Sequence, residues 1–363
     1  MSTNTRVFNK KDVRKPLGSD QQIAVIGYGN QGRAQALNLR DSGCSVVIGN
    51  RDDRYRKQVE ADKFTLLDIG EAVSNSSIIL ILVPDEVIPE LYRSQIEPNL
   101  EAGSMLVFAS GYALAFDRFR IEADVDITLL APRMIGVGVR ERYLTKEGFF
   151  CLVGIERDTT GRALERLLTL TFAVSGLYKP AIEVSFKQEA ILDLFNEQAF
   201  GPAFGRVLLS AIHVLLEKGL PPEAVLVELY MSEEMSFVYR TMAQVGLVGQ
   251  LRFHSETSQY GAMSRGARFL NPGLKGKMAR IYDEIESGDF AREWKKPISR
   301  LKLKALRFFA ARQKINAVEK KVRSRLGLED ASQPDHDPEE VHKIMQDESI
   351  ARELEELSKG FKD

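Results

Sequence analysis

The first half of the chain alternates short apolar runs rich in Val and Ile with segments whose apolar residues recur at helical spacing. The runs that we expect to be strands are residues 23–26, 46–48, 78–83, 105–108, 127–131 and 149–153. This rhythm is typical of βαβ units and predicts a parallel sheet covered by helices on both faces. We therefore expect residues 1–182 to form an α/β domain.

The pattern changes near Glu183, where strand-like runs give way to long segments with apolar residues at helical spacing. We expect helices over residues 187–216, 222–243, 271–287 and 301–326. Residues 183–326 are therefore predicted to form an all-helical domain. Residues 327–363 are rich in charge, with Pro334 and Pro338 ahead of a helical pattern that has few apolar positions. We interpret them as a solvated or partner-packed tail.

Length and charge agree with two domains and argue against a nucleic-acid partner. A chain of 363 residues exceeds the usual single core, and 44% hydrophobic residues suffice for two. Lys and Arg number 50 against 51 Asp and Glu, so the formal net charge is -1. Such a balance provides no general positive field that would hold nucleic acid.

The cysteines and the polar start of the chain favour a soluble protein in a reducing compartment. Cys44 and Cys151 lie in apolar stretches that we expect to be buried strands, which favours small core residues over a disulfide. Residues 1–15 contain no apolar segment typical of a signal peptide, and we expect no stretch long enough to span a bilayer. We therefore expect a cytoplasmic protein without a membrane partner.

A glycine-rich turn follows the first expected strand. It reads Gly27-Tyr28-Gly29-Asn30-Gln31-Gly32 and lies between the strand and a helix expected over residues 34–40, the context in which this motif binds a dinucleotide. Gly27 would permit the tight turn, Gly29 would let the backbone approach the pyrophosphate, and Gly32 would allow the helix to pack closely. A purely structural strand–helix turn is the less favoured alternative.

The end of the second expected strand bears on the choice between NADP and NAD. It runs into a charged segment with Arg51, Arg54 and Arg56, and arginines at this place accommodate a ribose 2′-phosphate. Asp52 and Asp53 favour NAD instead, because a carboxylate there binds the ribose hydroxyls. Since Arg51 comes first, we expect NADP(H) to be preferred, with a merely solvated loop as the alternative.

Several segments, in order along the chain, resemble ketol-acid reductoisomerases of branched-chain amino-acid synthesis. They are residues 23–32, 38–43, 84–87, 96–100, 193–198 and 287–294, and the likeness covers about residues 10–325. The resemblance implies a Rossmann domain followed by a knotted helical domain, and a homodimer whose subunits complete each other's active sites. It also implies that Pro84, Asp85 and Ser110 belong to the cofactor site.

The resemblance further implies two Mg²⁺ ions that promote an alkyl migration before hydride reduces the resulting ketone. Asp193 and Glu197 match the first acidic pair of that site, and their i,i+4 spacing lets both carboxylates face one ion. By spacing alone such a pair is more often a solvated helix face.

The second acidic pair departs from the family pattern. Glu228 matches its first position, but Ser232 then occupies the second. Shifting the register by two residues recovers Glu234 and places Tyr230 in the first position. Glu233 and Glu234 are neighbours, so on a helix only one could face the site. We therefore expect a weak or single Mg²⁺ site formed by Asp193, Glu197 and Glu228.

Other positions expected to be catalytic have partly changed. The family's Ala-His-Gly is Ala109-Ser110-Gly111 here, and the Lys of its Pro-Lys-Gly-Pro-Gly loop is Arg133, which keeps the charge but cannot exchange a proton near neutral pH. The family's substrate-contacting Ser corresponds to Ser255. His254 could donate a proton, but a packing role is favoured.

These observations lead to three hypotheses about function. The first is a diverged reductase that passes hydride from NADPH to a small C=O or C=N substrate, with Asp193, Glu197, Glu228, Arg133 and Ser255 at its catalytic site. The second is an authentic ketol-acid reductoisomerase in which Glu233 or Glu234 replaces the displaced ligand. The third is a non-catalytic NADP-binding protein.

Overall fold

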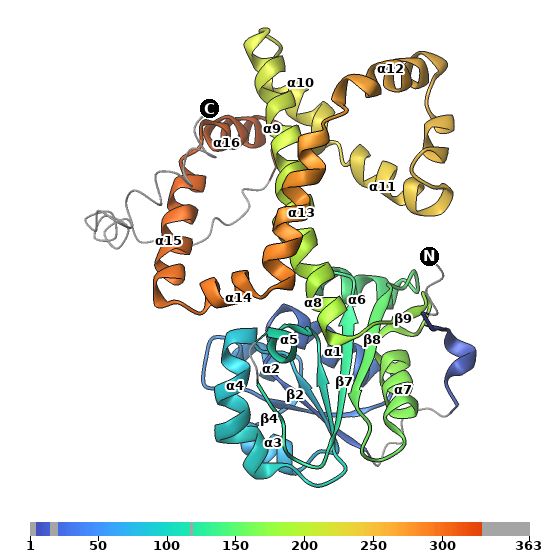
Figure 1. The fold of residues 1–363 in the computed structure, drawn as a ribbon, viewed down its shortest axis with the longest axis vertical. Coiled ribbons are helices and arrows are strands. Elements are labelled where there is room, and N and C mark those ends of the chain that lie inside the picture. The colour runs from blue at the N-terminus through green and yellow to red at the C-terminus, as the bar shows by residue number, and fades with distance from the viewer. Residues whose placement is uncertain (1–4, 15–20, 117–118, 329–363) are drawn as a thin grey trace. The chain divides into compact units, whose positions relative to one another are not determined.

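The computed structural model describes residues 5–14, 21–116 and 119–328 (Figure 1). The chain forms two compact units, Met1–Leu194 and Phe195–Asp363, which divide inside a helix and later than the change of pattern near Glu183. The charged tail predicted over residues 327–363 lies outside the described residues from residue 329 onward.

The first unit contains one nine-stranded sheet in the order β1-β9-β8-β7-β6-β5-β2-β3-β4. The strands are β1 (Val7–Phe8), β2 (Gln22–Ile26), β3 (Ser45–Gly49), β4 (Thr65–Leu67), β5 (Ile78–Ile81), β6 (Met105–Phe108), β7 (Asp126–Pro132), β8 (Cys151–Arg157) and β9 (Ala181–Glu183). The order β4-β3-β2-β5-β6-β7 is that of a doubly wound dinucleotide-binding domain, so the predicted α/β class is confirmed.

The expectation of an all-parallel sheet is wrong for the strands beyond β7. β8 runs antiparallel to β7, and β1 runs antiparallel to β9. The expected run over residues 149–153 gave no direction, because a buried strand has the same apolar pattern in either orientation. The short strands β1, β4 and β9 were not expected at all.

Helices cover both faces of the sheet, as predicted. On one face, α1 (Asn30–Asp41), α6 (Gly136–Leu144) and α7 (Ala163–Ser175) pack in a cluster that includes Ile23 and Val25 of β2. On the other face, α3 (Ile69–Ser74), α4 (Ile88–Leu91) and α5 (Tyr112–Phe116) pack in a cluster that includes Ala24 and Ile26. Alternate residues of β2 therefore pack into two different cores, one on each face of the sheet. This explains the continuous apolar run of β2.

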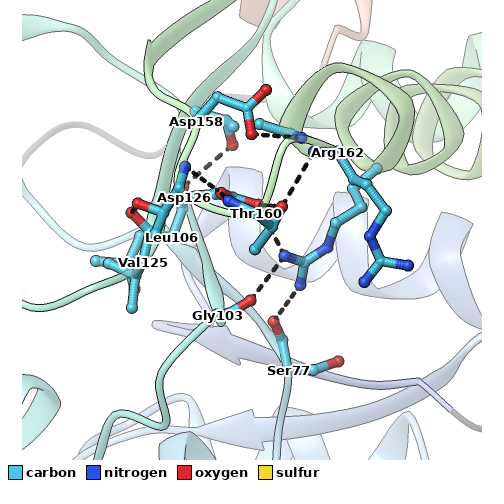
Figure 2. Close-up of polar contacts among 12 residues, drawn as sticks. Ser77, Gly103, Leu106, Val125, Asp126, Asp158, Thr160 and Arg162 are labelled. Atoms are coloured by element: carbon cyan, nitrogen blue, oxygen red, sulfur yellow. Dashed lines mark hydrogen bonds and ion pairs between the residues drawn. The ribbon is translucent and has the colours of Figure 1, made fainter.

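A buried polar cluster ties together the amino ends of β5, β6 and β7 (Figure 2). The Asp126 carboxylate, which is fully buried, accepts hydrogen bonds from the Thr160 hydroxyl at 2.8 Å and from Arg166 at 2.9 Å. Arg166 also donates to the main-chain oxygens of Ser77 (2.8 Å) and Gly103 (2.9 Å). Because the glycine turn follows the opposite, carboxyl end of β2, this cluster supports the sheet rather than the candidate site.

The second unit is helical and begins near the end of α8 (Phe186–Phe195). The π-helix η5 (Asn196–Phe200) and α9 (Gly201–Glu217) continue α8 as one long helical segment. The remaining elements are α10 (Pro222–Leu226), the π-helix η6 (Val227–Met231), α11 (Glu234–Val245), the 3₁₀ turns η7 (Gly249–Phe253) and η8 (Ala267–Phe269), α12 (Glu256–Gly266), α13 (Pro272–Glu286), α14 (Asp289–Trp294), α15 (Pro297–Ala311) and α16 (Lys314–Leu326). The all-helical class is confirmed.

Two of the expected long helices are interrupted. The helix expected over residues 222–243 breaks at Ser232 and Glu233, where Glu233 has a positive φ of 62°. The helix expected over residues 301–326 divides at Arg312 and Gln313. Both interruptions occur without Gly or Pro, which are the residues that mark helix ends most clearly in a sequence.

The helical segment Phe186–Glu217 corrects the expectation that no stretch could span a bilayer. By length and composition its 32 residues would suffice to cross a membrane. Apolar side chains such as Val207 and Val214 are also largely exposed on it. A helix that packs against another protein chain meets the same criteria.

Both cysteines are free, as expected. Cys151 is buried at the start of β8, and Cys44 is half-buried just before β3 rather than inside the strand. Burial raises the pKa of the Cys44 thiol to about 11 and that of Cys151 to about 12, so both remain protonated near neutral pH.

Candidate functional site

The glycine turn between β2 and α1 has the tight geometry that its sequence predicts. Gly27 has a positive φ of 95°, and a Cβ there would lie 2.7 Å from the main-chain oxygen of Leu82. A Cβ on Gly32 would lie 2.1 Å from the main-chain oxygen of Gly27. A Cβ on Gly29 would meet nothing within 4 Å, so the turn leaves open space on that side. A side chain is excluded at the first and third glycines, and a ligand has room at the second.

Helix α1 begins at Asn30, four residues earlier than expected, so Asn30, Gln31 and Gly32 form its first turn. Gly29 is the residue before the helix and has no side-chain cap, which leaves N–H groups directed toward the turn. The turn also stands where the strand order reverses between β2 and β5, the place where open α/β sheets bind ligands.

The buried side chain of Tyr28 holds the glycine turn in place. Its ring is 1% exposed, and its hydroxyl donates a hydrogen bond of 2.9 Å to Asp62. Asp62 also accepts from Arg33 at 2.6 Å and 3.0 Å. The Arg33 guanidinium is the main reason that the pKa of the Asp62 carboxyl is lowered, and burial opposes it. The Tyr28 side chain therefore supports the turn from within the domain core.

A cleft of about 780 Å³ opens beside the turn. Of the expected cofactor residues, its lining includes Gly27, Tyr28, Gly29, Arg51, Arg54 and Pro84. A smaller hollow of about 350 Å³ is lined by the expected residues Tyr28, Gly29, Asn30 and Arg54, together with Gly136 and other residues. Gln31, Gly32, Arg56, Asp85 and Ser110 line neither. Both volumes are within the range of small-molecule sites.

The loop after β3 carries the charges that would meet a ribose. Asp53 accepts hydrogen bonds from the main-chain N–H of Tyr55 and from Asn50, both at 2.9 Å, and it pairs with Arg51 at 3.2 Å. Burial alone would raise the pKa of Asp53, but these donors hold it below its usual value. Arg51 is 81% exposed, whereas Arg56 pairs with Asp52 at 3.6 Å on α2 (Arg56–Ala61).

Arg133 forms an ion-pair cluster with two acids of α8. Its guanidinium lies 2.9 Å from the Asp193 carboxylate and 3.4 Å from that of Glu189. Glu189 is fully buried, and its other oxygen accepts from the main-chain N–H of Gly111 at 2.6 Å. Sequence analysis missed Glu189, although its position four residues before Asp193 places both on one helix face.

The loop that carries Arg133 also contacts the glycine turn. Gln31 donates a hydrogen bond of 2.9 Å to the main-chain oxygen of Met134. A Cβ on Gly136 would lie 2.3 Å from the main-chain oxygen of Asn30, so the two backbones touch. The dinucleotide turn and the Arg133 loop are therefore linked directly within the first unit.

The acids expected to bind metal do not form a cluster among the residues that the structure describes. Asp193 is paired with Arg133, Glu197 lies in η5, and Glu228 is exposed in η6. In that part of the chain no three His, Cys, Asp or Glu side chains are grouped to hold a metal ion. The carboxylates have the chemistry that Mg²⁺ prefers, but the neutral Ser232 stands where the family pattern has its fourth acid.

Ser255 and His254 have local structural partners. Ser255 is the N-cap of α12, and its hydroxyl oxygen accepts from the main-chain N–H of Ser258 at 3.2 Å. The His254 ring nitrogen Nε2 is hydrogen-bonded to the Gln250 side chain at 2.9 Å. These contacts agree with the packing role favoured for His254 and give Ser255 a capping role that its sequence context did not suggest.

Comparison with known proteins covers both units. A family model described as acetohydroxy acid isomeroreductase, NADPH-binding domain, matches residues 18–179, and one described as ketol-acid reductoisomerase, C-terminal domain, matches residues 186–327. The ketol-acid reductoisomerase (NADP(+)) of Methanocaldococcus jannaschii is 36% identical over 89% of this chain and 99% of its own length. The protein of the same name from Methanopyrus kandleri is 35% identical, with 90% and 99% covered.

A solved structure extends the similarity to three dimensions. An NADH-preferring ketol-acid reductoisomerase from an uncultured archean superimposes with a TM-score of 0.81 at 33% identity. The match covers 88% of this chain and 98% of that one.

Proposed function

Since this chain belongs to the ketol-acid reductoisomerase family and is therefore an oxidoreductase, we propose that it passes hydride from NADPH to a small substrate with a C=O or C=N bond. The proposal includes an altered second metal site and little or no alkyl migration. Migration in this family needs two metal ions, as the resemblance implies, whereas hydride transfer needs the dinucleotide and a substrate beside it.

The observation that carries the proposal is the helix break after Glu228. A second carboxylate on the same face would stand at Ser232, whose hydroxyl is neutral. Glu233 is in a left-handed conformation, and Glu234 begins the next helix. The break separates both acids from the helical run that carries Glu228, which supports an altered second metal site. Because Ser232 offers no carboxylate, the residues present do not fit two ions.

The dinucleotide is expected to lie along the cleft, with its pyrophosphate at Gly29 and the first turn of α1. Arg51 and Arg54 line the cleft at the loop after β3, where a 2′-phosphate would be placed. This supports NADP(H) over NAD(H). The NADH preference of the similar solved structure belongs to that protein. The proposal for this chain rests on the arginines of the loop after β3.

The second unit favours a homodimer. Among its described residues, one small buried cluster consists of Ile212, Val225, Leu226, Ile315 and Val322. Large apolar side chains are exposed on several of its helices, namely Phe204, Val207, Phe237, Tyr260, Met263 and Phe269. A second copy of the chain would cover such surface, as the family resemblance implies. We propose a cytoplasmic homodimer without nucleic-acid or membrane partners.

An authentic ketol-acid reductoisomerase remains the alternative. Sequence identity of 36% and 35% over nearly the whole length of the two relatives favours it. In that case Glu233 or Glu234 would replace the displaced ligand. The helix break is the feature that this alternative must explain.

An NADPH-oxidation assay with three substrates separates these functions. The proposal predicts turnover of a simple 2-keto acid or a cyclic imine and little turnover of 2-acetolactate, with Mg²⁺ present in every assay. Brisk turnover of 2-acetolactate would establish the alternative. NADPH binding without oxidation by any substrate would favour a non-catalytic protein.

A further inference from the structure

We propose that the Arg133 guanidinium is a built-in cation that occupies the acidic face of α8 and excludes a divalent ion from Asp193. This inference deepens the proposed function, on which it rests, because it names the group that takes the place of a metal charge. It concerns Arg133, Glu189 and Asp193, all of which lie in the first unit.

The geometry provides the first argument. The guanidinium is 2.9 Å from one carboxylate and 3.4 Å from the other, so it bridges acids that are one helical turn apart. An Arg fork can hold two carboxylates at once, whereas an ammonium is a single point of charge. The positive charge is therefore fixed on Asp193, the residue that the family resemblance assigns to metal binding.

The position of the guanidinium is set by the backbone on both sides. Arg133 directly follows β7, and its main-chain N–H donates to Phe150 at 2.8 Å. Glu189 is anchored by the N–H of Gly111. A Cβ on Gly111 would lie 2.1 Å from the main-chain oxygen of Phe186, so this loop and the start of α8 are in direct contact. The ion-pair cluster is therefore built into the packing of the first unit.

The charge balance provides the second argument. Two carboxylates and one guanidinium give a formal charge of -1, compared with -2 for the acids alone. A divalent ion at Asp193 would have to displace the guanidinium or be repelled by it. Displacement would break the ion pair between Arg133 and Asp193, which is costly.

Part of the Arg133 guanidinium also remains accessible to a substrate. Its side chain is 32% exposed, so N–H donors remain available for the oxygen of a carbonyl that is being reduced. The link from Gln31 to Met134 holds its loop against the dinucleotide turn. A fixed cation at this place can polarise a carbonyl without a metal.

The test is a Mn²⁺ titration of the full-length protein without substrate, in which electron paramagnetic resonance measures free Mn²⁺. Arg133→Met should raise Mn²⁺ affinity at least about 10-fold, because Asp193 and Glu189 regain their net charge. Adding Asp193→Asn to that variant should abolish the gain. Arg133→Lys, which keeps the charge but loses the fork, should give a smaller gain and serves if the Met variant does not fold.

Arg140→Met is the matched control, because Arg140 pairs with Asp41 and Asn38 on the far end of α1. It should leave Mn²⁺ affinity unchanged. NADPH binding measured by fluorescence verifies that each variant is folded. Equal Mn²⁺ affinity in the folded wild type and the folded Arg133 variants would overturn the inference. Because no substrate is present, a failure of the proposed reductase activity would not alter this result.

Discussion

The side chain of Gln31 donates a hydrogen bond of 2.9 Å to the main-chain oxygen of Met134, one residue beyond Arg133. Gln31 belongs to the glycine motif, and Gln35 in turn donates to it at 3.2 Å. The bond joins the segment that would bind pyrophosphate to the segment that carries the fixed cation. Gln31 is therefore a positioning residue for the Arg133 loop.

Replacing Gln31 by Met removes this bond without adding charge near the phosphate site. A single hydrogen bond contributes about 1 kcal/mol, so we expect kcat to fall roughly 3- to 10-fold while the NADPH dissociation constant changes less than about 2-fold. Gln244→Met changes an exposed glutamine of α11 and should leave both constants unaltered. Parallel losses in kcat and NADPH affinity would argue for a purely structural role.

Arg51→Ala should reduce the preference for NADPH over NADH. The guanidinium would lose its contact with the 2′-phosphate, and a charge-assisted contact of about 1.4 kcal/mol corresponds to a roughly 10-fold change in the affinity ratio. Arg56→Ala is the control, because Arg56 points to Asp52 and Glu60 and lines neither hollow. Equal affinities of the wild type for the two dinucleotides would contradict this assignment.

Asp62→Asn should destabilise the protein in a pH-dependent manner. The pKa of Asp62 is lowered in the folded protein, so its contribution is present above the unfolded pKa of about 4 and is lost as pH falls through the folded pKa. We expect a loss of about 1–3 kcal/mol at pH 7 and a smaller loss near pH 3, measured by urea unfolding. Asp52→Asn, at a carboxylate that is 87% exposed, should have little effect. Equal losses of Asp62→Asn at both pH values would exclude a charge effect.

The homodimer predicts a sedimentation or light-scattering mass of two chains at micromolar concentration. Phe237→Asp should lower that mass, because Phe237 is 68% exposed on α11 and a charge there opposes burial against a partner. A monomeric mass for the wild type would refute the proposed assembly.

The sequence predicted the fold class because both halves have clear periodicity and the glycine motif has its required neighbours. It did not predict the antiparallel turn-back from β7 to β8, since an apolar run carries no direction. It also missed the break at Glu233, which adopts a left-handed conformation with a side chain that disfavours it. Packing of a local segment can override its propensity, and such overrides are not visible in spacing.

The candidate site was predicted in part for the same reasons. Gly27 and Gly32 have the geometric roles that the motif assigns, because those roles depend only on local backbone. The partners of Arg133 could not be predicted, since they depend on how the loop after β7 and helix α8 meet in the folded unit. Ser255 was assigned from resemblance, and its capping of α12 became evident only from the helix start.

The central claim is that hydride transfer is retained while alkyl migration is lost. It is tested most directly by comparing NADPH oxidation with 2-acetolactate and with the 3-hydroxy-2-keto acid that alkyl migration in 2-acetolactate would form, both in the presence of Mg²⁺. We predict that the rearranged acid is reduced and that 2-acetolactate is not. Reduction of both acids at comparable Mg²⁺-dependent rates would contradict the account and identify an authentic reductoisomerase.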